Sequence, residues 1–123
     1  MNVHVSRVPF NEACVAVRRE VFVVGQHVPV DIEIDGLDEA CVHFLATLDD
    51  VPVGTCRLRF THGKAKAERV AVLSKCRGLG LGIQLMEALE AHAANNGYEA
   101  VVLNAQEQVI PFYERQGYTA SGP

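Results

Sequence analysis

The chain has 123 residues, of which 49% are hydrophobic and 21% are charged, and these proportions are ordinary for a single globular domain spanning residues 1–123. The formal net charge of −4 gives no field that would attract nucleic acid, and no basic run offsets it, so we expect no nucleic-acid partner. No apolar stretch approaches the roughly 18–20 residues of a membrane span, and the N-terminus lacks a signal-peptide pattern, so we expect a cytoplasmic protein with no membrane partner.

The four cysteines are scattered along the chain, and none of them forms a CxxC pair. This spacing does not predict a zinc site, and without an export signal it does not imply a disulfide framework. We therefore expect reduced and mostly buried cysteines, and no bound metal.

The first part of the chain predicts a strand followed by a helix. Residues 3–8 alternate between apolar and polar side chains, as a half-buried strand does. Asn11 can cap a helix, and Cys14, Val17 and Val21 then fall on one apolar stripe of that helix. Three charged residues lie largely off this stripe: Arg18, Arg19 and Glu20.

The next segment, residues 24–38, is predicted to be a loop or a short second helix, because Gly25 and Pro29 break the apolar pattern. Its region carries five carboxylates: Asp31, Glu33, Asp35, Asp38 and Glu39. Residues 31–36 resemble the start of a calcium-binding loop, but Val42 stands where that loop needs a glutamate. Two interpretations of the acidic segment remain open, namely a solvated turn and a site that attracts a cationic or amine substrate.

Three strand-like runs follow, at residues 41–48, 53–60 and 65–73. Short turns at 49–52 and 61–64 join them. Consecutive strands that are connected so tightly form an antiparallel meander.

A glycine-rich turn at residues 77–82 reads Arg-Gly-Leu-Gly-Leu-Gly and precedes a predicted helix. Glycines leave backbone N–H groups accessible because no Cβ stands in the way. The first N–H groups of a helix also lack partners inside the helix, and the helix dipole adds partial positive charge there. This turn therefore predicts a site for phosphate or pyrophosphate, with Arg77 as a further cation at its rim.

The rest of the chain, from residue 83, predicts a helix and one more strand that is parallel to the last strand of the meander. Apolar residues recur with helical spacing over residues 83–93, and Gly97 suits the position after the last turn. The apolar run 100–103 predicts a strand that is buried on both faces, which completes a right-handed βαβ unit. A short helix at 108–116 and a final strand from Tyr118 would end the chain. The expected fold class is thus α+β, with a mixed sheet.

Two other phosphate-binding motifs fit the turn less well. A Rossmann motif would read GxGxxG and would have an acidic residue at the end of the next strand, whereas this turn reads GxGxG and no acid follows until Glu107. A P-loop would require a lysine directly after its last glycine, and none follows Gly82.

The turn resembles the acyl-CoA-binding signature of the GNAT superfamily of N-acetyltransferases, which reads R/Q-x-x-G-x-G/A. A second segment, Pro-Phe-Tyr-Glu-Arg-Gln-Gly-Tyr at 111–118, is similar to the LYEKxGF segment of that superfamily. The order of the predicted elements also resembles the GNAT fold, and the two signatures cover roughly residues 40–118. Within the superfamily, the EVFV and LNAQ segments resemble a branch of small acyltransferases, although Gly25 stands where that branch carries a glutamate.

The resemblance implies an acetyl-CoA-dependent N-acyltransferase in which a small-molecule amine attacks the donor directly while both are bound. It implies that backbone amides of the turn hold the CoA pyrophosphate and that a strand edge pairs with the pantetheine amides. The turn residues are Arg77, Gly78, Leu79, Gly80, Leu81, Gly82 and Ile83, and the strand residues are Val70, Ala71 and Val72.

Catalytic roles follow from the same resemblance. Tyr113 occupies the position of the acid that protonates the departing thiolate, although it could instead be a core aromatic. Glu68 is the candidate base, with a surface carboxylate paired to Arg69 or to a lysine as the alternative. Asn104 and Gln106 are candidate cofactor contacts. Two histidines are less favoured bases, since His43 is expected to pack in a strand and His62 to lie in a solvated turn.

The resemblance also implies a partner. Members of the superfamily usually have two strands after the tyrosine helix, and only residues 118–123 follow it here. An uncovered sheet edge would result, so we expect a homodimer in which a second copy covers it. The alternative to an enzyme is a non-catalytic acyl-CoA-binding or interaction module on the same fold.

Overall fold

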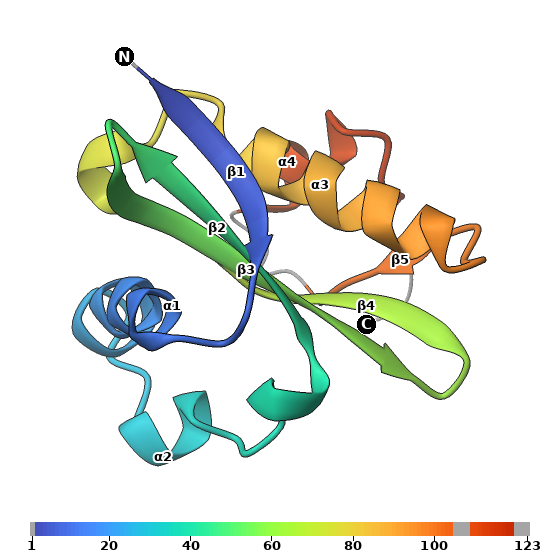
Figure 1. The fold of residues 1–123 in the computed structure, drawn as a ribbon, viewed down its shortest axis with the longest axis horizontal. Helices are drawn as coiled ribbons and strands as arrows, with labels where there is room; N and C mark the ends of the chain where they lie inside the picture. The colour runs from blue at the N-terminus through green and yellow to red at the C-terminus, as the bar shows by residue number, and fades with distance from the viewer. Residues whose placement is uncertain (1, 105–108, 120–123) are drawn as a thin grey trace.

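A twisted sheet of five strands runs through the molecule in a computed structural model that describes residues 2–104 and 109–119 (Figure 1). The strand order is β1-β2-β3-β4-β5, and neighbours are antiparallel except for the parallel pair β4 and β5. This arrangement confirms the expected α+β class, a meander followed by a βαβ unit. The strands are β1 Val3–Val8, β2 Val42–Leu48, β3 Val51–Thr61, β4 Lys64–Val72 and β5 Val101–Val102.

Helices cover both faces of this sheet (Figure 1). On one face the first helical segment packs against β4, where Val17 and Val21 contact Ala71. On the other face the long helix α3 packs through buried Leu85 and Leu89. The helices are α1 Glu12–Arg18, the π-helix η1 Arg19–Val24, α2 Val30–Glu33, the 3-10 helices η2 Asp38–Ala40 and η3 Ser74–Cys76, α3 Leu81–Asn95, and α4 Ile110–Glu114.

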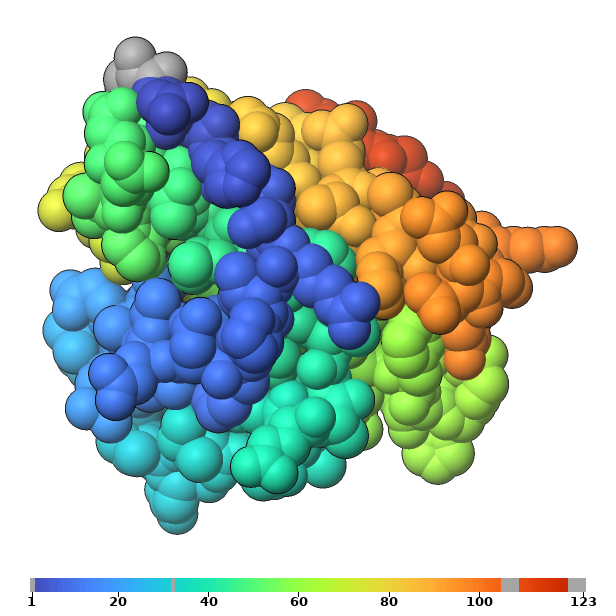
Figure 2. Space-filling model, in the orientation of Figure 1, coloured from blue at the N-terminus to red at the C-terminus, as the bar shows by residue number. Residues whose placement is uncertain are grey.

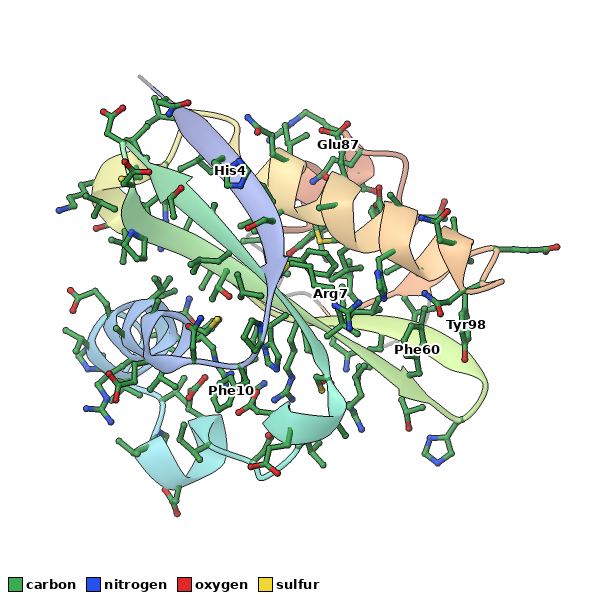
Figure 3. All side chains as sticks on the ribbon, viewed as in Figure 1. His4, Arg7, Phe10, Phe60, Glu87 and Tyr98 are labelled. Carbon is green, nitrogen blue, oxygen red and sulfur yellow. The ribbon has the colours of Figure 1, made fainter. Side chains whose placement is uncertain are left out.

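Local signals in the sequence explain several boundaries. The Asn11 side chain accepts a hydrogen bond from the backbone N–H of Cys14 at 3.1 Å, which confirms the predicted cap of α1. Gly97 has a φ of 87° and ends α3 as expected. Just beyond it, the ring of Tyr98 stacks on Phe60 of β3 with centroids 4.7 Å apart, and Figure 3 shows this pair at the end of the sheet.

The C-terminal strand differs from its prediction. The run 100–103 was expected to be buried on both faces, but β5 contains only Val101–Val102 and Val102 is 40% exposed. The reason is its place at the end of the strand order, where one edge has no neighbour among the described strands. Tyr118 and Thr119 are not part of a strand, and the rest of the predicted final strand lies outside the described residues.

The expected burial of the cysteines is confirmed for Cys14, Cys56 and Cys76, while Cys41 is partly exposed. None of the helices in residues 2–104 and 109–119 is long and apolar enough to cross a membrane.

Two buried arginines fasten the acidic segment to the sheet. Arg18 of α1 is 1% exposed, and it donates from Nε to Glu33 Oε1 at 2.5 Å and from Nη1 to Asp38 Oδ1 at 2.6 Å. Arg57 of β3, also 1% exposed, donates from Nη2 to Asp35 Oδ2 at 2.6 Å and from Nη1 to Asp38 Oδ1 at 3.0 Å. Because both arginines bind Asp38, they form one network.

The same network reaches along β4. Glu68 accepts from Arg57 Nη2 and from Arg59 Nε, each at 2.9 Å. Arg69 lies 3.2 Å from Asp35 through Nη2, and its Nε lies 3.5 Å from Glu33. We refer to these side chains as the arginine–carboxylate network; its members are Arg18, Glu33, Asp35, Asp38, Arg57, Arg59, Glu68 and Arg69.

The network corrects both interpretations for Glu33 and Asp38, whereas Asp31 and Glu39 of the same segment are exposed and lie outside it. Glu33 and Asp38 are 3% and 5% exposed, so they are not part of a solvated turn. Arginines compensate their charges, so they are not free to attract a cationic substrate. Burial would raise the pKa of Asp38, but hydrogen bonds from Arg18 and Arg57 lower it. Figure 2 shows the segments from α1 to η2, coloured blue to green-cyan, forming one layer against the end of the sheet.

We expect Arg57→Gln to destabilise the protein by about 3–5 kcal/mol, because it leaves buried carboxylates without their main cation. The matched control is Arg59→Gln, which also removes a cation bound to Glu68. Because the Arg59 side chain is 25% exposed, this substitution should have a much smaller effect. Urea unfolding at pH 7 measures both. Equal losses in the two variants would contradict a structural role for the buried network.

Candidate active site

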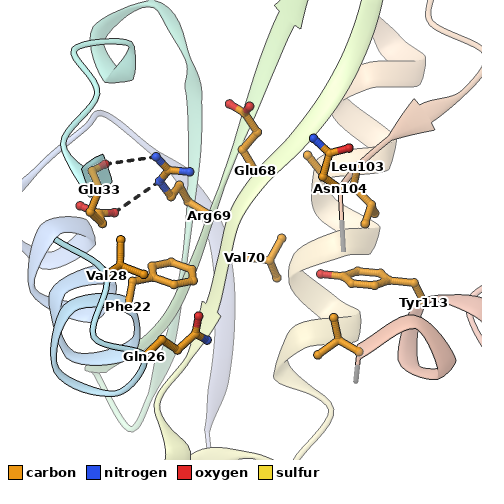
Figure 4. Close-up of a pocket in the computed structure, with 12 residues that line it drawn as sticks. Phe22, Gln26, Val28, Glu33, Glu68, Arg69, Val70, Leu103, Asn104 and Tyr113 are labelled. Atoms are coloured by element: carbon orange, nitrogen blue, oxygen red, sulfur yellow. Dashed lines mark hydrogen bonds and ion pairs between the residues drawn. The ribbon is translucent and has the colours of Figure 1, made fainter. Parts of the chain in front are cut away.

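A pocket opens where β4 and β5 part. Among the described residues, the two strands pair through Ala65 with Val101 and Lys66 with Val102. Beyond these pairs a cavity of about 320 Å³ lies between β4, the loop after η1, and the segment that joins β5 to α4 (Figure 4). Its floor is formed by residues 67–70 of β4.

An irregularity in β4 shapes this floor. Between the pairs Thr55–Ala71 and Arg57–Glu68, β4 has one residue more than β3, which is a β-bulge. Arg69 lies in the bulge with a φ of 53°. In a regular strand successive side chains alternate between faces, yet consecutive β4 residues line the pocket here. The bulge thus turns extra backbone and side chains toward the cavity.

The opposite walls differ in character (Figure 4). Phe22 and Val28, from η1 and the loop after it, provide apolar surface, with Gln26 and Glu33 beside them. The segment after β5 provides Leu103 and Asn104, and α4 provides Tyr113. Helical periodicity does not predict this loop wall, because the apolar stripe of the first helix ends at Val21; Phe22 lies in the EVFV segment that the family resemblance singled out.

The glycine-rich turn lies between β4 and α3. Gly78 and Gly80 have φ values of 87° and 79°, which favour glycine over other residues. Gly80 is the N-cap of α3, and no described side chain caps this helix, so its first N–H groups can bind a ligand. Arg77 is exposed, and its Nε donates to the carbonyl of Val72 at 3.2 Å, which places the guanidinium at the end of β4.

Gly82 has a different reason to be glycine. A Cβ at this position would lie 3.0 Å from Cζ of Phe112, so Gly82 allows α4 to pack closely on the first turn of α3. By contrast, a Cβ on Gly78 or Gly80 would meet nothing within 4 Å. The other predicted turn residues are accessible in part, since Leu79 and Ile83 are exposed while Leu81 is buried.

Tyr113 enters the pocket from α4, and Figure 4 shows its hydroxyl pointing toward Val70. Burial raises the pKa of Tyr113 above its usual value, so the phenol stays protonated at neutral pH. A protonated phenol facing a cavity can donate a hydrogen bond or a proton there.

Glu68 also lines the pocket, but cations surround it. Burial would raise the pKa of Glu68, whereas the hydrogen bond from Arg59 and the charge of Arg57 lower it to about 2. Glu68 is therefore an ionised carboxylate. A third cation, Lys66, has its Nζ 3.5 Å from Oε2 of Glu68. The alternative partner expected from the sequence, Arg69, binds the neighbouring Glu33 and Asp35.

The remaining candidates are only partly assembled at the pocket. Val70 and Asn104 line it, whereas Ala71 packs against Val17 and Val21 and does not line it. Gln106 lies outside the described residues. His43 is buried with Nε2 at 2.8 Å from the carbonyl of Asp38, and His62 lies in an exposed turn, so neither is at the pocket.

Comparisons with known proteins place this arrangement in a family. The sequence profile of the Acetyltransferase (GNAT) family matches residues 12–118. The chain is 44% identical over 102 residues to the uncharacterized N-acetyltransferase YjcF of Bacillus subtilis, with 83% of this chain and 73% of that protein covered.

Solved structures agree. The crystal structure of an acyl-CoA N-acyltransferase from Pseudomonas aeruginosa is 30% identical with a TM-score of 0.86, covering 99% of this chain and 92% of that one. Glucosamine-6-phosphate N-acetyltransferase from Arabidopsis thaliana, at 19% identity and a TM-score of 0.70, covers 100% of this chain and 95% of that one and shares the fold alone. The chain therefore belongs to the acetyltransferase (GNAT) family and is an acyl-CoA-dependent N-acetyltransferase.

Proposed function

We propose that the protein transfers an acetyl group from acetyl-CoA to the amine of a small molecule, by direct attack while both are bound. The observation that carries this proposal is the pocket between the diverging strands β4 and β5, into which the Tyr113 hydroxyl points. A cavity of about 320 Å³ suits a small acceptor beside the reactive end of the donor.

The donor would lie along β4 and end at the glycine-rich turn. The uncapped N–H groups at the start of α3 and the guanidinium of Arg77 suit the pyrophosphate. The backbone of Val70, Ala71 and Val72 is proposed to pair with the pantetheine amides, because β5 does not pair with this part of β4. Asn104, beside the reactive end, is proposed as a further donor contact.

The proposed transfer forms a C–N bond to the amine and breaks the C–S bond of the thioester. Backbone N–H groups at the β4 bulge are suited to polarise the thioester carbonyl, since the bulge interrupts the ladder there. Tyr113 would give its proton to the departing thiolate, and its raised pKa keeps that proton available.

The amine must lose a proton in the same reaction. A carboxylate with a pKa of about 2 takes a proton poorly near pH 7. We therefore propose that Glu68 orients the amine or a water molecule through which the amine proton passes to solvent, and that Tyr113 regains its proton from solvent after the thiol leaves. The acceptor itself is expected to contact the apolar wall of Phe22 and Val28.

Acetyl-CoA should stabilise the protein, by about 2.7 kcal/mol at a concentration of one hundred times its Kd. NAD and ATP should not stabilise it to this extent.

Arg77→Gln should weaken acetyl-CoA binding by about tenfold, because it removes the cation at the rim of the turn. Calorimetric titration measures this, with Lys75→Gln as the control that removes an exposed charge in η3, two residues away. Equal weakening by both substitutions would argue against a specific contact from Arg77.

Tyr113→Phe should lower kcat by about 100-fold, the scale of a general acid, while the Kd for acetyl-CoA stays within about twofold. Release of free CoA thiol across a panel of primary amines measures turnover and separates an enzyme from a non-catalytic acyl-CoA binder. Tyr98→Phe is the control, because Tyr98 stacks on Phe60 away from the pocket. Full turnover after Tyr113→Phe would remove Tyr113 from the mechanism.

We further propose a homodimer in which a second copy covers the exposed edge of β5, where Val102 is 40% exposed. Light scattering at micromolar concentration should give twice the chain mass. Val102→Lys should shift the protein toward monomer, whereas Val24→Lys, at a residue 57% exposed on η1, should not. A wild-type protein that is monomeric under these conditions would contradict the proposal.

A further inference from the structure

The contacts that the structure describes for Tyr113 are made by its ring and not by its hydroxyl. Within residues 2–104 and 109–119, no group forms a hydrogen bond with Tyr113 Oη. Nor does α4 fix it alone, since this helix has five residues and no side-chain cap, and so short a helix depends on tertiary contacts. The contacts of the tyrosine ring must therefore determine where the hydroxyl points.

Two aromatic rings flank Tyr113 edge to face. The Phe112 ring lies 5.0 Å away at 78°, and the Tyr118 ring lies 5.8 Å away at 77°. Gly117, with a φ of 93°, folds the chain back after α4, and the N–H of Tyr118 donates to the carbonyl of Tyr113 at 3.1 Å. The chain thus returns its next aromatic residue to the tyrosine that faces the pocket.

Each flanking ring is in turn fastened to α3. Phe112 sits over Gly82 in the first turn, where even a methyl group would lie 3.0 Å from Cζ. Tyr118 donates its hydroxyl hydrogen bond to the carboxylate of Glu90. Burial and the hydrogen bond to Glu90 raise the pKa of Tyr118, so it remains the donor. The anchors are eight residues apart in the helix, which is about 12 Å along its axis.

We propose that Phe112 and Tyr118, held by Gly82 and Glu90, form a two-point aromatic clamp that positions Tyr113 for proton transfer. This inference rests on the proposed function, since it assigns a purpose to the position of the acid. Phe112, Tyr118 and Glu90 are positioning residues that do not line the pocket. Because the same helix begins at the proposed pyrophosphate site, the clamp ties the acid and the donor to one rigid element.

The clamp matters because proton transfer requires the donor within hydrogen-bond reach of the acceptor. A displacement of about 1 Å can reduce the rate by about 100-fold even when binding is unchanged. Loss of one of two anchors should displace the ring only in part, so a reduction in kcat of about tenfold is expected.

The test compares Tyr118→Phe and Glu90→Ala, which each remove the hydrogen bond, with Glu90→Gln, which keeps an acceptor oxygen. Glu87→Ala is the control for charge loss, because Glu87 is an exposed residue on the outer face of α3 (Figure 3). The first readout is fluorine NMR of protein labelled with 3-fluorotyrosine, with the Tyr113 resonance assigned by its absence in Tyr113→Phe. The second is kcat with acetyl-CoA and the fastest amine of the panel, together with the Kd for acetyl-CoA.

Tyr118→Phe and Glu90→Ala should both shift or broaden the Tyr113 resonance and lower kcat by about tenfold, with Kd within about twofold. Glu90→Gln and Glu87→Ala should do neither. In a Tyr113→Phe background the same substitutions should no longer lower kcat, because there is no acid to misplace.

Two failures are distinguishable. If Tyr113→Phe alone slows turnover but Tyr118→Phe and Glu90→Ala leave the Tyr113 resonance and kcat unchanged, the clamp is overturned and the proposed acid stands. If Tyr113→Phe retains full turnover, the proposed acid is overturned, and the positioning role falls with it.

Discussion

The divergence of β4 from β5 is the constraint on which the rest of the site depends. In the part of the chain that the structure describes, two residue pairs join the strands, and none follows Lys66 and Val102. A parallel sheet edge left open in this way exposes backbone groups that a ligand can satisfy. The pocket, the bulge and the glycine-rich turn all lie along the part of β4 that β5 leaves uncovered. The fold thus provides a place for an extended donor before any catalytic side chain is considered.

A second constraint holds the opposite wall in place. Residues 30–40 form only short helical segments, which have little stability of their own. Arg18 and Arg57 compensate by fastening that segment to α1 and β3 through buried carboxylates. Burying such charges is costly unless every partner is present. The network therefore holds the loop in one position. Because Glu33 belongs to the network and also lines the pocket, this position is fixed relative to the pocket.

The sequence predicted what depends on local pattern. The meander, the glycine-rich turn, the cap at Asn11 and the helix after the turn all follow from periodicity or turn chemistry. It failed where tertiary partners decide. The apolar stripe leaves Arg18 largely outside it, yet Arg18 is buried because carboxylates distant in the sequence bind it. One local feature is consistent with buried charge: Arg57 and Arg59 alternate with apolar residues in a strand.

The site shows the same division. Tyr113 and the turn are predicted from signature residues, whereas periodicity does not predict the loop wall of Phe22 and Val28. The three glycines read as one motif, yet Gly82 serves the packing of Phe112 while Gly78 and Gly80 satisfy the backbone conformation. Spacing alone cannot separate these reasons, because each requires only the absence of a Cβ.

We propose that acetyl-CoA occupies the uncovered edge of β4 and the start of α3. Hydrogen–deuterium exchange with and without acetyl-CoA tests this placement most directly. Bound acetyl-CoA should slow the exchange of backbone amides at residues 70–72 and 77–83, with little change in β1 and β2. Protection confined to other strands, or no protection at the turn under saturating acetyl-CoA, would contradict it.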